Sequence, residues 1–464
     1  MALEKFIFRP GINREGTDYS NDGGWFDANL VRFRKGLPEK IGGWAKATLS
    51  TYQSTVRALH AWVDLSLTRY LGLGATWKYY IKEGDNFYDI TPLRSTTAAG
   101  DVTFAATNGS STITITDTNH GAVTDDFVTF SGAASLGGTV TATVLNQEYQ
   151  ILLVTGTNTY TITAKDTSGA TVTANGSDSG NGGSSVVGAY QINVGLDTYV
   201  ESSGWGAGTW GAGTWGSTTA LTSANQLRLW SHDNFGEDLI MNVRAGGIYY
   251  FDTSAATLGT TRATPLTSLS GANLTPTLAL QVLVSDIDRH VVCLGADPIS
   301  GSSRSGALDP MLVAWSDQEN AAVWEPLATN TAGSFRLSAG SQIIGAIRAR
   351  QETLIWTDTA LYSMTFIGQP FTFGINLVNE GVGLISPNGA VNTPKGIFWM
   401  DKKGFYTYSG AVQDIPCTVQ NYVFSDFNQG QAFQVFGFVN KEFDEVGWFY
   451  CSADSEVINR YVVY

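Results

Sequence analysis

The sequence predicts an all-β chain, folded as a β-propeller of about six blades with a small inserted β-sandwich and an extended N-terminal arm. A tryptophan recurs in similar surroundings at Trp356, Trp399 and Trp448, at intervals of 43 and 49 residues. Each lies in an apolar run followed by a polar turn and a second apolar run, which indicates strand, turn and strand. A repeat of this length without helical periodicity is typical of propeller blades. The 52 glycines and the charged fraction of only 15% also favour a turn-rich β protein.

Residues 1–50 are predicted to form the arm, with one or two short strands between glycine-containing turns. The run Leu30–Arg34 alternates apolar and basic residues, which predicts a strand with one buried and one cationic face. Two interpretations of the basic side chains stay open: contact with an acidic protein or a neighbouring subunit, and a solvated strand face. The side chains concerned are Arg32, Arg34, Lys35 and Lys40.

Residues 51–95 are predicted to form the first blade. Short apolar segments separated by polar turns fit the four-strand meander from which one blade is built. These segments are Val56–Trp62, Tyr70–Leu73, Tyr79–Ile81 and Tyr88–Ile90.

Residues 96–190 interrupt the blade pattern, because threonine, serine and glycine dominate and tryptophan is missing. Strictly alternating segments such as Ser111–Thr116 and Thr159–Thr163 are separated by turn residues. They predict a small β-sandwich inserted in a loop of the first or second blade. Its exit, Ser177–Ser185, has the composition of a flexible linker.

Residues 191–464 are predicted to supply the remaining blades, most clearly at 342–378 and 389–418. The last blade begins near Phe433, so only two or three strands precede Tyr464. Since a blade needs about four strands, we expect either further residues or a strand from the N-terminal arm to complete it. Completion by the arm would leave no open sheet edge.

The run Trp205–Trp215 repeats a five-residue unit of glycine, alanine, threonine and tryptophan. It could form an aromatic platform for sugars, or a glycine-rich loop whose tryptophans fill gaps between blades. The second interpretation is preferred, since a copied unit is typical of a tolerant loop. The GxGxxG spacing inside it opens no helix and is not taken as a nucleotide site.

The net charge of −14 disfavours a protein that wraps nucleic acid, which needs cations to displace counterions from phosphates. It fits plain solubility, or a surface past which DNA slides without binding. Three cysteines without CxxC spacing predict free thiols in a reducing compartment. Neither a signal peptide nor an apolar run of about 18 residues is found, so export and membrane insertion are not expected.

No catalytic residue, metal site or cofactor is predicted. The four histidines lack metal-ligand spacing, and neither GxSxG nor a P-loop occurs. The run Trp315–Trp324 resembles the Asp-box turns of sialidase-like propellers, in which the aspartate accepts backbone N–H groups and the tryptophan packs beneath. A sialidase also needs an arginine cluster and a nucleophile pair. Arg348 and Arg350 are the closest approach to such a cluster.

Five segments have a distinctive sequence: Gly11–Glu15, Trp25–Asp27, Val31–Trp44, Trp315–Asn320 and Leu354–Tyr362. They resemble segments of the tail-hub proteins of short-tailed bacteriophages, also described as nozzle or packaged-DNA-stabilisation proteins. The resemblance extends over residues 1–93 and about 220–464, while the insert at 96–190 is similar to β-modules of phage structural and fibre proteins.

The resemblance implies a structural, non-enzymatic protein of the virion tail, assembled in the host cytoplasm. It implies a hexameric ring below the portal and adaptor that conducts and retains packaged DNA, with transient, non-specific passage of DNA. Its partners would be head-to-tail adaptor proteins and tail fibres or tailspikes. The basic arm would then dock onto the adaptor or a neighbouring subunit.

Two alternatives remain. The first is a glycan-binding or glycan-cleaving propeller for receptor recognition, with Trp205–Trp215 as its platform. The second is a trimeric receptor-binding fibre, for which the sequence shows no shaft-like repeat.

Overall fold

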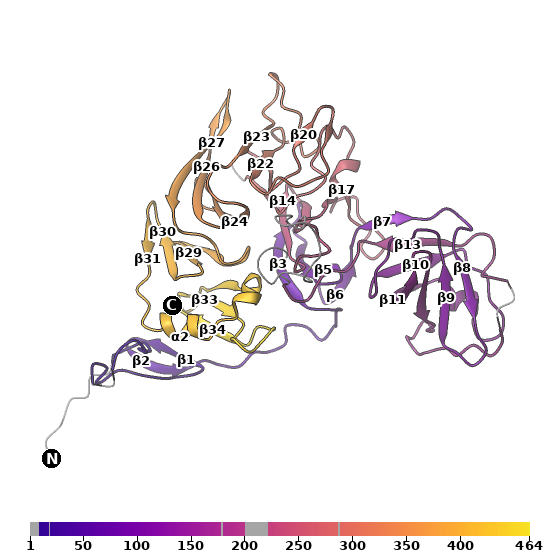
Figure 1. Cartoon of the computed structure of the whole chain (residues 1–464), viewed down its shortest axis with the longest axis horizontal. Coiled ribbons are helices and arrows are strands. Elements are labelled where there is room, and N and C mark those ends of the chain that lie inside the picture. The colour runs from indigo at the N-terminus through magenta and orange to yellow at the C-terminus, as the bar shows by residue number, and fades with distance from the viewer. Residues whose placement is uncertain (1–8, 18, 178–179, 200–220, 286–287) are drawn as a thin grey trace, which may run out of the picture. The chain divides into compact units, whose positions relative to one another are not determined.

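The computed structural model describes residues 9–17, 19–177, 180–199, 221–285 and 288–464. The chain divides into two compact units. Unit 1 consists of Met1–Ser50, Thr198–Leu221 and Gly271–Tyr464, and unit 2 of Thr51–Asp197 and Thr222–Ser270. The predicted fold class is confirmed: the chain is almost entirely β and is a β-propeller with six blades. Two blades belong to unit 2 and four to unit 1 (Figure 1).

The first blade of unit 2 is a four-stranded antiparallel meander. Its strands are β3 (Val56–Val63), β4 (Arg69–Ala75), β5 (Tyr79–Glu83) and β6 (Asn86–Asp89). The second blade of unit 2 has the same order, with β14 (Trp230–Phe235), β15 (Asp238–Val243), β16 (Ile248–Phe251) and β17 (Thr264–Pro265).

Of two glycines in β4, Gly74 allows the two blades of unit 2 to pack closely, and Gly72 makes room for a side chain of its own blade. A Cβ on Gly74 would lie 2.7 Å from three atoms of the Trp230 side chain. A Cβ on Gly72 would lie 2.5 Å from the Tyr79 hydroxyl. Trp230 is buried and donates its indole N–H to the carbonyl of Ala75 at 2.9 Å. The alternation of leucine and glycine in β4 therefore leaves room on one face for aromatic rings.

The insert lies between the two blades in sequence and belongs to the same unit. Its strands hydrogen-bond in the order β7-β13-β10-β11-β12-β9-β8. Register shifts interrupt the pairing of β11 with β12, and one core draws side chains from β8 and β9 as well as from β10 and β13. The elements are β7 (Leu93–Thr96), β8 (Thr103–Ala106), β9 (Thr112–Thr116), β10 (Phe127–Ser131), α1 (Ala142–Leu145), β11 (Glu148–Gly156), β12 (Thr159–Thr163) and β13 (Val187–Gln191).

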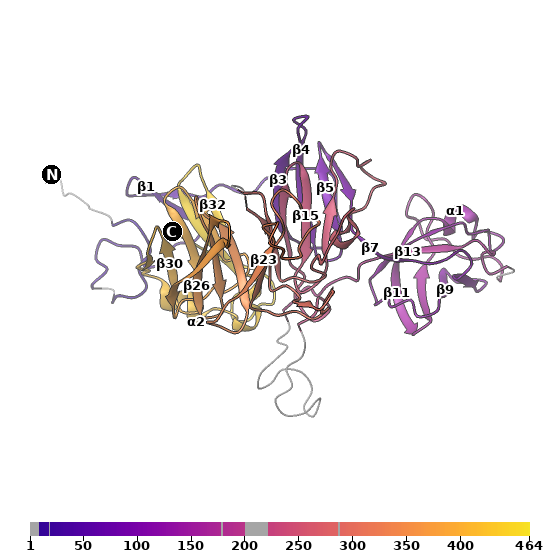
Figure 2. The ribbon, with the colours of Figure 1, turned by 90° about the horizontal axis from the view of Figure 1, so that it is seen from above.

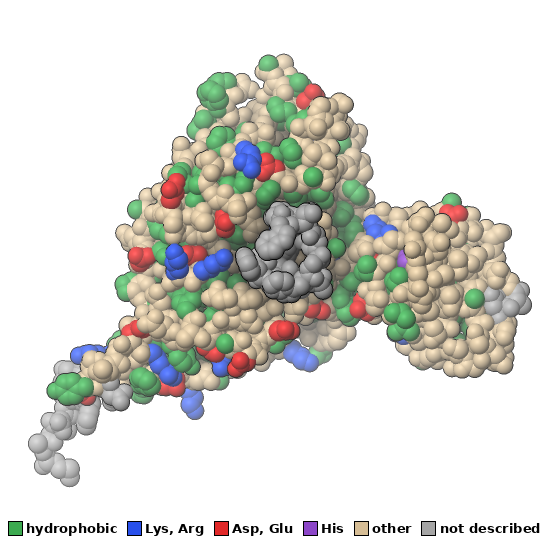
Figure 3. Space-filling model, in the orientation of Figure 1, with side chains coloured by type: hydrophobic (Ala, Val, Ile, Leu, Met, Phe, Trp, Pro, Cys, Tyr) green, Lys and Arg blue, Asp and Glu red, His purple; other side chains and the backbone are tan. Residues whose placement is uncertain are grey.

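Strand alternation fixes the two faces of the insert. In β9 the isoleucines are buried and the threonines point outward. The face of the insert seen in Figure 3 is accordingly polar and nearly uncharged.

Unit 1 contains the other four blades, each antiparallel and paired in chain order. A two-stranded hairpin of β20 (Ile299–Ser300) and β21 (Ser303–Arg304) interrupts the third blade. The third blade contains β18 (Gln281–Val284), β19 (Val291–Leu294), β22 (Leu312–Trp315) and β23 (Gly333–Arg336). The fourth contains β24 (Ile343–Arg348), β25 (Thr353–Thr357), β26 (Ala360–Gly368) and β27 (Thr372–Glu380), and the fifth contains β28 (Ala390–Thr393), β29 (Gly396–Met400), β30 (Phe405–Tyr408) and β31 (Val412–Asp414). The last contains β32 (Phe436–Asn440), β33 (Glu445–Tyr450) and β34 (Arg460–Val463).

The recurring tryptophans occupy equivalent positions, since each lies in the second strand of its sheet. Trp356, Trp399 and Trp448 are buried at 0, 0 and 1% exposure. The rings of Trp356 and Trp399 meet edge to face with centroids 5.3 Å apart. The indole of Trp448 donates to the carbonyl of Gly389, so its polar atom is satisfied in the core. The sequence repeat thus marks equivalent buried positions, with Trp356 and Trp399 in one apolar cluster and Trp448 in a second.

Short helices occur only at connections in the described part of the chain. They are α1 of the insert, η1 (Leu266–Ser268), α2 (Gln420–Ser425) and η2 (Gln429–Gln434). No helix among the described residues is both long and apolar enough to cross a lipid bilayer.

The arm contains one hairpin, formed by β1 (Val31–Arg34) and β2 (Leu37–Lys40). Its turn places Lys35 and Gly36 at φ 50° and 83°, as a two-residue turn with left-handed residues requires. β1 pairs with β2, and the last sheet pairs only β32, β33 and β34 in the described residues. The suggestion that a strand of the arm completes the last blade is therefore wrong for these strands.

Candidate functional site

Arg32 is the one predicted contact residue that the structure buries. Its guanidinium donates two hydrogen bonds to the Glu445 carboxylate, from Nε to Oε1 at 2.8 Å and from Nη2 to Oε2 at 3.1 Å. It also lies over the Phe443 ring at 3.4 Å. The side chains of Arg32 and Glu445 are only 11% and 15% exposed. Arg32 is therefore paired within the chain and is not part of a solvated strand face, whereas its contact with a partner stays a prediction.

The other three predicted residues are exposed. Arg34 lies 3.9 Å from Glu39, and both side chains are largely solvated, so this pair contributes little stability. Lys35 stands at the turn, and Lys40 ends β2 opposite Val31. The structure thus separates one anchoring arginine from three available cations.

A second anchor of the arm escaped prediction from the sequence. Arg14 pairs with Asp27 at 2.6 Å and stacks over Tyr422 of α2 at 4.2 Å. Its backbone N–H donates to the carbonyl of Thr418, and the Glu15 carboxylate accepts from the backbone N–H of Asn421. The only sequence signal was that charged residues flank a glycine-rich segment. Both anchors fasten the arm to the last two blades of unit 1.

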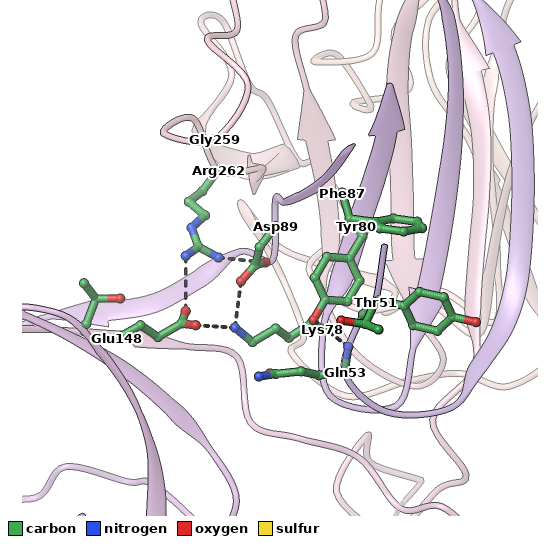
Figure 4. A pocket seen from close by; sticks show the side chains of 11 residues that line it. Thr51, Gln53, Lys78, Tyr80, Phe87, Asp89, Glu148, Gly259 and Arg262 are labelled. Atoms are coloured by element: carbon green, nitrogen blue, oxygen red, sulfur yellow. Dashed lines mark hydrogen bonds and ion pairs between the residues drawn. The ribbon is translucent and has the colours of Figure 1, made fainter. Parts of the chain in front are cut away.

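A second candidate site lies in unit 2, where four charged side chains from four segments meet (Figure 4). We call this set the charge cluster; it consists of Lys78, Asp89, Glu148 and Arg262. Lys78 immediately precedes β5, Asp89 ends β6, Glu148 begins β11 of the insert, and Arg262 precedes β17. The cluster therefore connects the insert to both blades of its unit.

In the charge cluster, each of the two cations pairs with both carboxylates. Lys78 Nζ lies 3.0 Å from Asp89 Oδ2 and 2.5 Å from Glu148 Oε2. Arg262 spans the same carboxylates, at 2.8 Å from Asp89 and 3.4 Å from Glu148. Gln191 donates its amide to both carboxylates as well, at 3.1 and 2.6 Å. The side chain of Lys78 is only 4% exposed, and these partners surround its ammonium group.

The charges of the cluster compensate one another. Burial raises the pKa of Asp89, but the charges of Lys78 and Arg262 and the hydrogen bonds from Thr91 outweigh it and hold that pKa below the ordinary value. Asp89 is consequently a carboxylate at neutral pH and not a proton donor. Two cations and two anions saturated by each other suit a structural joint better than acid–base catalysis.

The four side chains of the charge cluster line an open pocket of about 440 Å³. Tyr52, Tyr80 and Phe87 form its aromatic side, with Tyr52 and Phe87 edge to face at 5.3 Å. Gln53 and Thr129 add polar groups. Aromatic faces beside hydrogen-bonding groups are a common way to hold a polar ring. None of these residues was selected from the sequence, because they come from segments far apart in the chain.

The Asp-box turn has the structural role expected from its sequence. Asp317 Oδ1 accepts the backbone N–H groups of Gln318 and Thr331, both at 2.9 Å, and the Thr331 hydroxyl at 2.8 Å. Burial raises the pKa of Asp317, yet these hydrogen bonds outweigh it and keep that pKa below its ordinary value. Trp324 is buried at 1% exposure.

Two histidines distant in sequence meet in unit 2. The rings of His60 and His232 lie 5.0 Å apart, and the Tyr79 hydroxyl is 2.8 Å from His232 Nδ1. Burial, then the nearby charge of His60, lowers the pKa of His232 to about 3. A neutral ring hydrogen-bonded to the Tyr79 hydroxyl fits a packing role. The described residues hold no group of three or more histidine, cysteine or acidic side chains placed to bind a metal.

The cysteines, the arginine pair and the tryptophan repeat are the other features considered in the sequence. The described cysteines carry free thiols, and Cys293 and Cys451 are buried. Arg348 ends β24 and donates to the carbonyl of Val284, whereas Arg350 lies beyond the strand and is exposed. The repeat at 205–215 lies outside the described residues.

No family model matches the chain, and no curated protein sequence matches it. Solved structures with a similar fold include the endosialidase of phage phi92, at 12% identity over 89% of this chain and 55% of that chain, with a TM-score of 0.22. Hsv2 of Kluyveromyces lactis is 9% identical over 50% and 61%, with a TM-score of 0.26. PorZ of Porphyromonas gingivalis is 9% identical over 88% and 69%, with a TM-score of 0.25. The chain spans about half the length of the endosialidase, and these similarities support no inference about activity.

Proposed function

We propose that this chain is a structural subunit of a bacteriophage tail, a tail-hub or nozzle protein that assembles as a hexameric ring. The ring lies below the portal and adaptor, and conducts and retains packaged DNA. It binds adaptor proteins and tail fibres or tailspikes, and it catalyses no reaction. The localisation proposed is the virion tail, after assembly in the host cytoplasm.

The observation that carries the proposal is the N-terminal arm. It lies outside all six blade sheets, yet Arg32 and Arg14 fasten it to them. The side chains of Arg34, Lys35 and Lys40 remain exposed. A monomeric protein gains little from such an arm, whereas a subunit of an assembly can use one to contact its neighbours. This segment also carries the densest resemblance to the tail-hub family.

Two further features fit the proposal. A chain with net charge −14 offers phosphates no continuous cationic track, so DNA can pass without being held. The charged side chains that could support catalysis already have partners within the chain. The cations and carboxylates of the charge cluster pair with one another, and Asp317 accepts hydrogen bonds within a turn. Both features suit a scaffold.

Electron microscopy of the purified full chain over a concentration series tests the proposal. We expect six-fold rings in projection and a hexamer mass by native mass spectrometry. A protein that stays monomeric at every concentration, or that hydrolyses glycans in a broad substrate screen, would contradict it.

The pocket beside Tyr52 and Tyr80 favours one alternative, a glycan-binding propeller for receptor recognition. A glycan array separates the two functions. Binding to a defined glycan that is lost in Tyr52→Ala, in a protein that forms no ring, would favour the alternative.

A further inference from the structure

The segment that begins at Leu30 and ends at Leu49 leaves large apolar side chains in solvent. Leu30 and Leu37 are 55% and 61% exposed, and Trp44 and Leu49 are 93% and 96% exposed. Residues 30–49 belong to unit 1, and the described residues of that unit do not cover these side chains. We call residues 30–49 the strap. Apolar side chains spaced along one strap mark a surface that another molecule covers.

The charge of the strap identifies the kind of molecule. It contains five basic residues and one acidic residue, Glu39. The rest of the chain has 22 basic and 40 acidic residues. A second copy of this chain therefore offers an acidic surface to a basic strap, which favours both encounter and register. Basic and apolar side chains lie together on the hairpin in Figure 3.

The anchors determine how the strap is presented. Arg32 lies inside the strap and is tied to Glu445, while Arg14 holds the segment before it. A strap fastened at these points loses less conformational freedom on binding than a free tail. Because a strap and the surface that receives it differ, the contact is heterologous, and heterologous contacts generate rings when the rotation closes.

We propose that the strap binds a second copy of this chain, with Leu37 and Trp44 buried against it and Arg34, Lys35 and Lys40 facing its acidic surface. Arg32 is an anchor and not part of this contact. The inference rests on the proposed function, and it names the segment that joins neighbouring subunits.

Sedimentation velocity and mass photometry of the full chain test the strap. We expect the double variant Leu37→Ser/Trp44→Ser to raise the concentration for half-assembly at least tenfold. The triple variant Arg34→Glu/Lys35→Glu/Lys40→Glu should weaken assembly similarly, and its effect should shrink at high salt. All these side chains are exposed, so thermal unfolding of the monomer should stay unchanged.

Matched controls change the same chemistry elsewhere. Ile367→Ser/Phe371→Ser removes apolar side chains that are 56% and 71% exposed at the turn between β26 and β27. Arg69→Glu/Lys165→Glu/Arg350→Glu changes the net charge equally at exposed sites outside the strap. We expect both controls to assemble as the unmodified chain does.

The outcomes separate the two proposals. If the strap variants form rings as well as the unmodified chain does, the proposed strap contact is wrong, but the proposed ring is not contradicted. A chain that never assembles would overturn both. A photocrosslinker at position 44 should capture a second copy; capture of only its own chain, or strap-dependent binding of a monomer to anionic lipid vesicles, would refute a second copy as the partner.

Discussion

Arg32 and Glu445 lie 413 residues apart in the sequence and form a two-pronged ion pair that closes the arm onto the last blade. Asn440 donates to the same carboxylate at 3.1 Å, and the Phe443 ring covers the guanidinium. The pair is therefore shielded from water on several sides, and shielded bidentate pairs are stronger than exposed ones.

Arg32→Ala should release the hairpin without unfolding the blades. A hydrogen-bonded charge pair of this kind contributes about 2 kcal/mol, so amide exchange in residues 31–40 should accelerate about 30-fold. Hydrogen exchange with mass spectrometry measures this. Arg34→Ala, which removes a solvated arginine from the same strand, is the control. Equal protection of the hairpin in both variants would show that Arg32 is not the anchor.

Lys78→Met should destabilise unit 2. It leaves Asp89 and Glu148 facing each other with Arg262 as their remaining cation, and breaking a buried pair costs about 3 kcal/mol. Urea unfolding followed by the fluorescence of the tryptophans reports the loss. Lys82→Met is matched, because Lys82 lies in the same blade but pairs with a 90% exposed Asp85. That control should cost less than about 1 kcal/mol; equal losses would contradict a closed cluster.

The blades were predictable because their signals are local. Each recurring tryptophan occurs in a run of apolar residues, and the same short context places it in the second strand of successive sheets. The Asp-box turn was predictable for the same reason, since Asp317 bonds to residues close by in the fold of one blade.

The sites were less predictable because their partners are distant in sequence. Alternation in β1 predicts that Arg32 and Arg34 share a face, but not that Glu445 meets only one of them. The charge cluster joins Lys78 to Glu148, which belongs to the insert. No spacing rule connects a blade to a domain inserted after it. Only the fold brings these side chains together.

Stability should fall on mild acidification because of His232. Its pKa is lowered from 6.5 to about 3, first by burial and then by the charge of His60. A lowered histidine pKa means that the unfolded chain binds the proton first. The neutral ring's contribution is complete above pH 6.5 and is lost as the pH falls from there toward 3.

The measurement is the free energy of unfolding at pH 7 and at pH 5.5. His232 alone should account for a loss of about 1 kcal/mol between them. His232→Gln keeps an acceptor for the Tyr79 hydroxyl but cannot titrate, so its loss should be smaller by that amount. A variant with the same pH dependence as the unmodified chain would show that His232 is not held neutral by the fold.

Gly74→Ala should disrupt the packing of the first two blades. The added Cβ would lie 2.7 Å from the Cβ, Cγ and Cδ1 atoms of Trp230, closer than real contacts allow. Trp230 cannot retreat easily, because it is buried and its indole N–H is bonded to Ala75. Overpacking of this kind costs about 1–3 kcal/mol. Thermal unfolding and the near-ultraviolet spectrum of the tryptophans should both change. The control is Gly176→Ala in the same unit, where nothing lies within 4 Å of the new Cβ. It should change neither the thermal unfolding nor the spectrum. An equal effect in the control would mean that the loss of stability comes from reduced backbone freedom and not from a clash with the ring of Trp230.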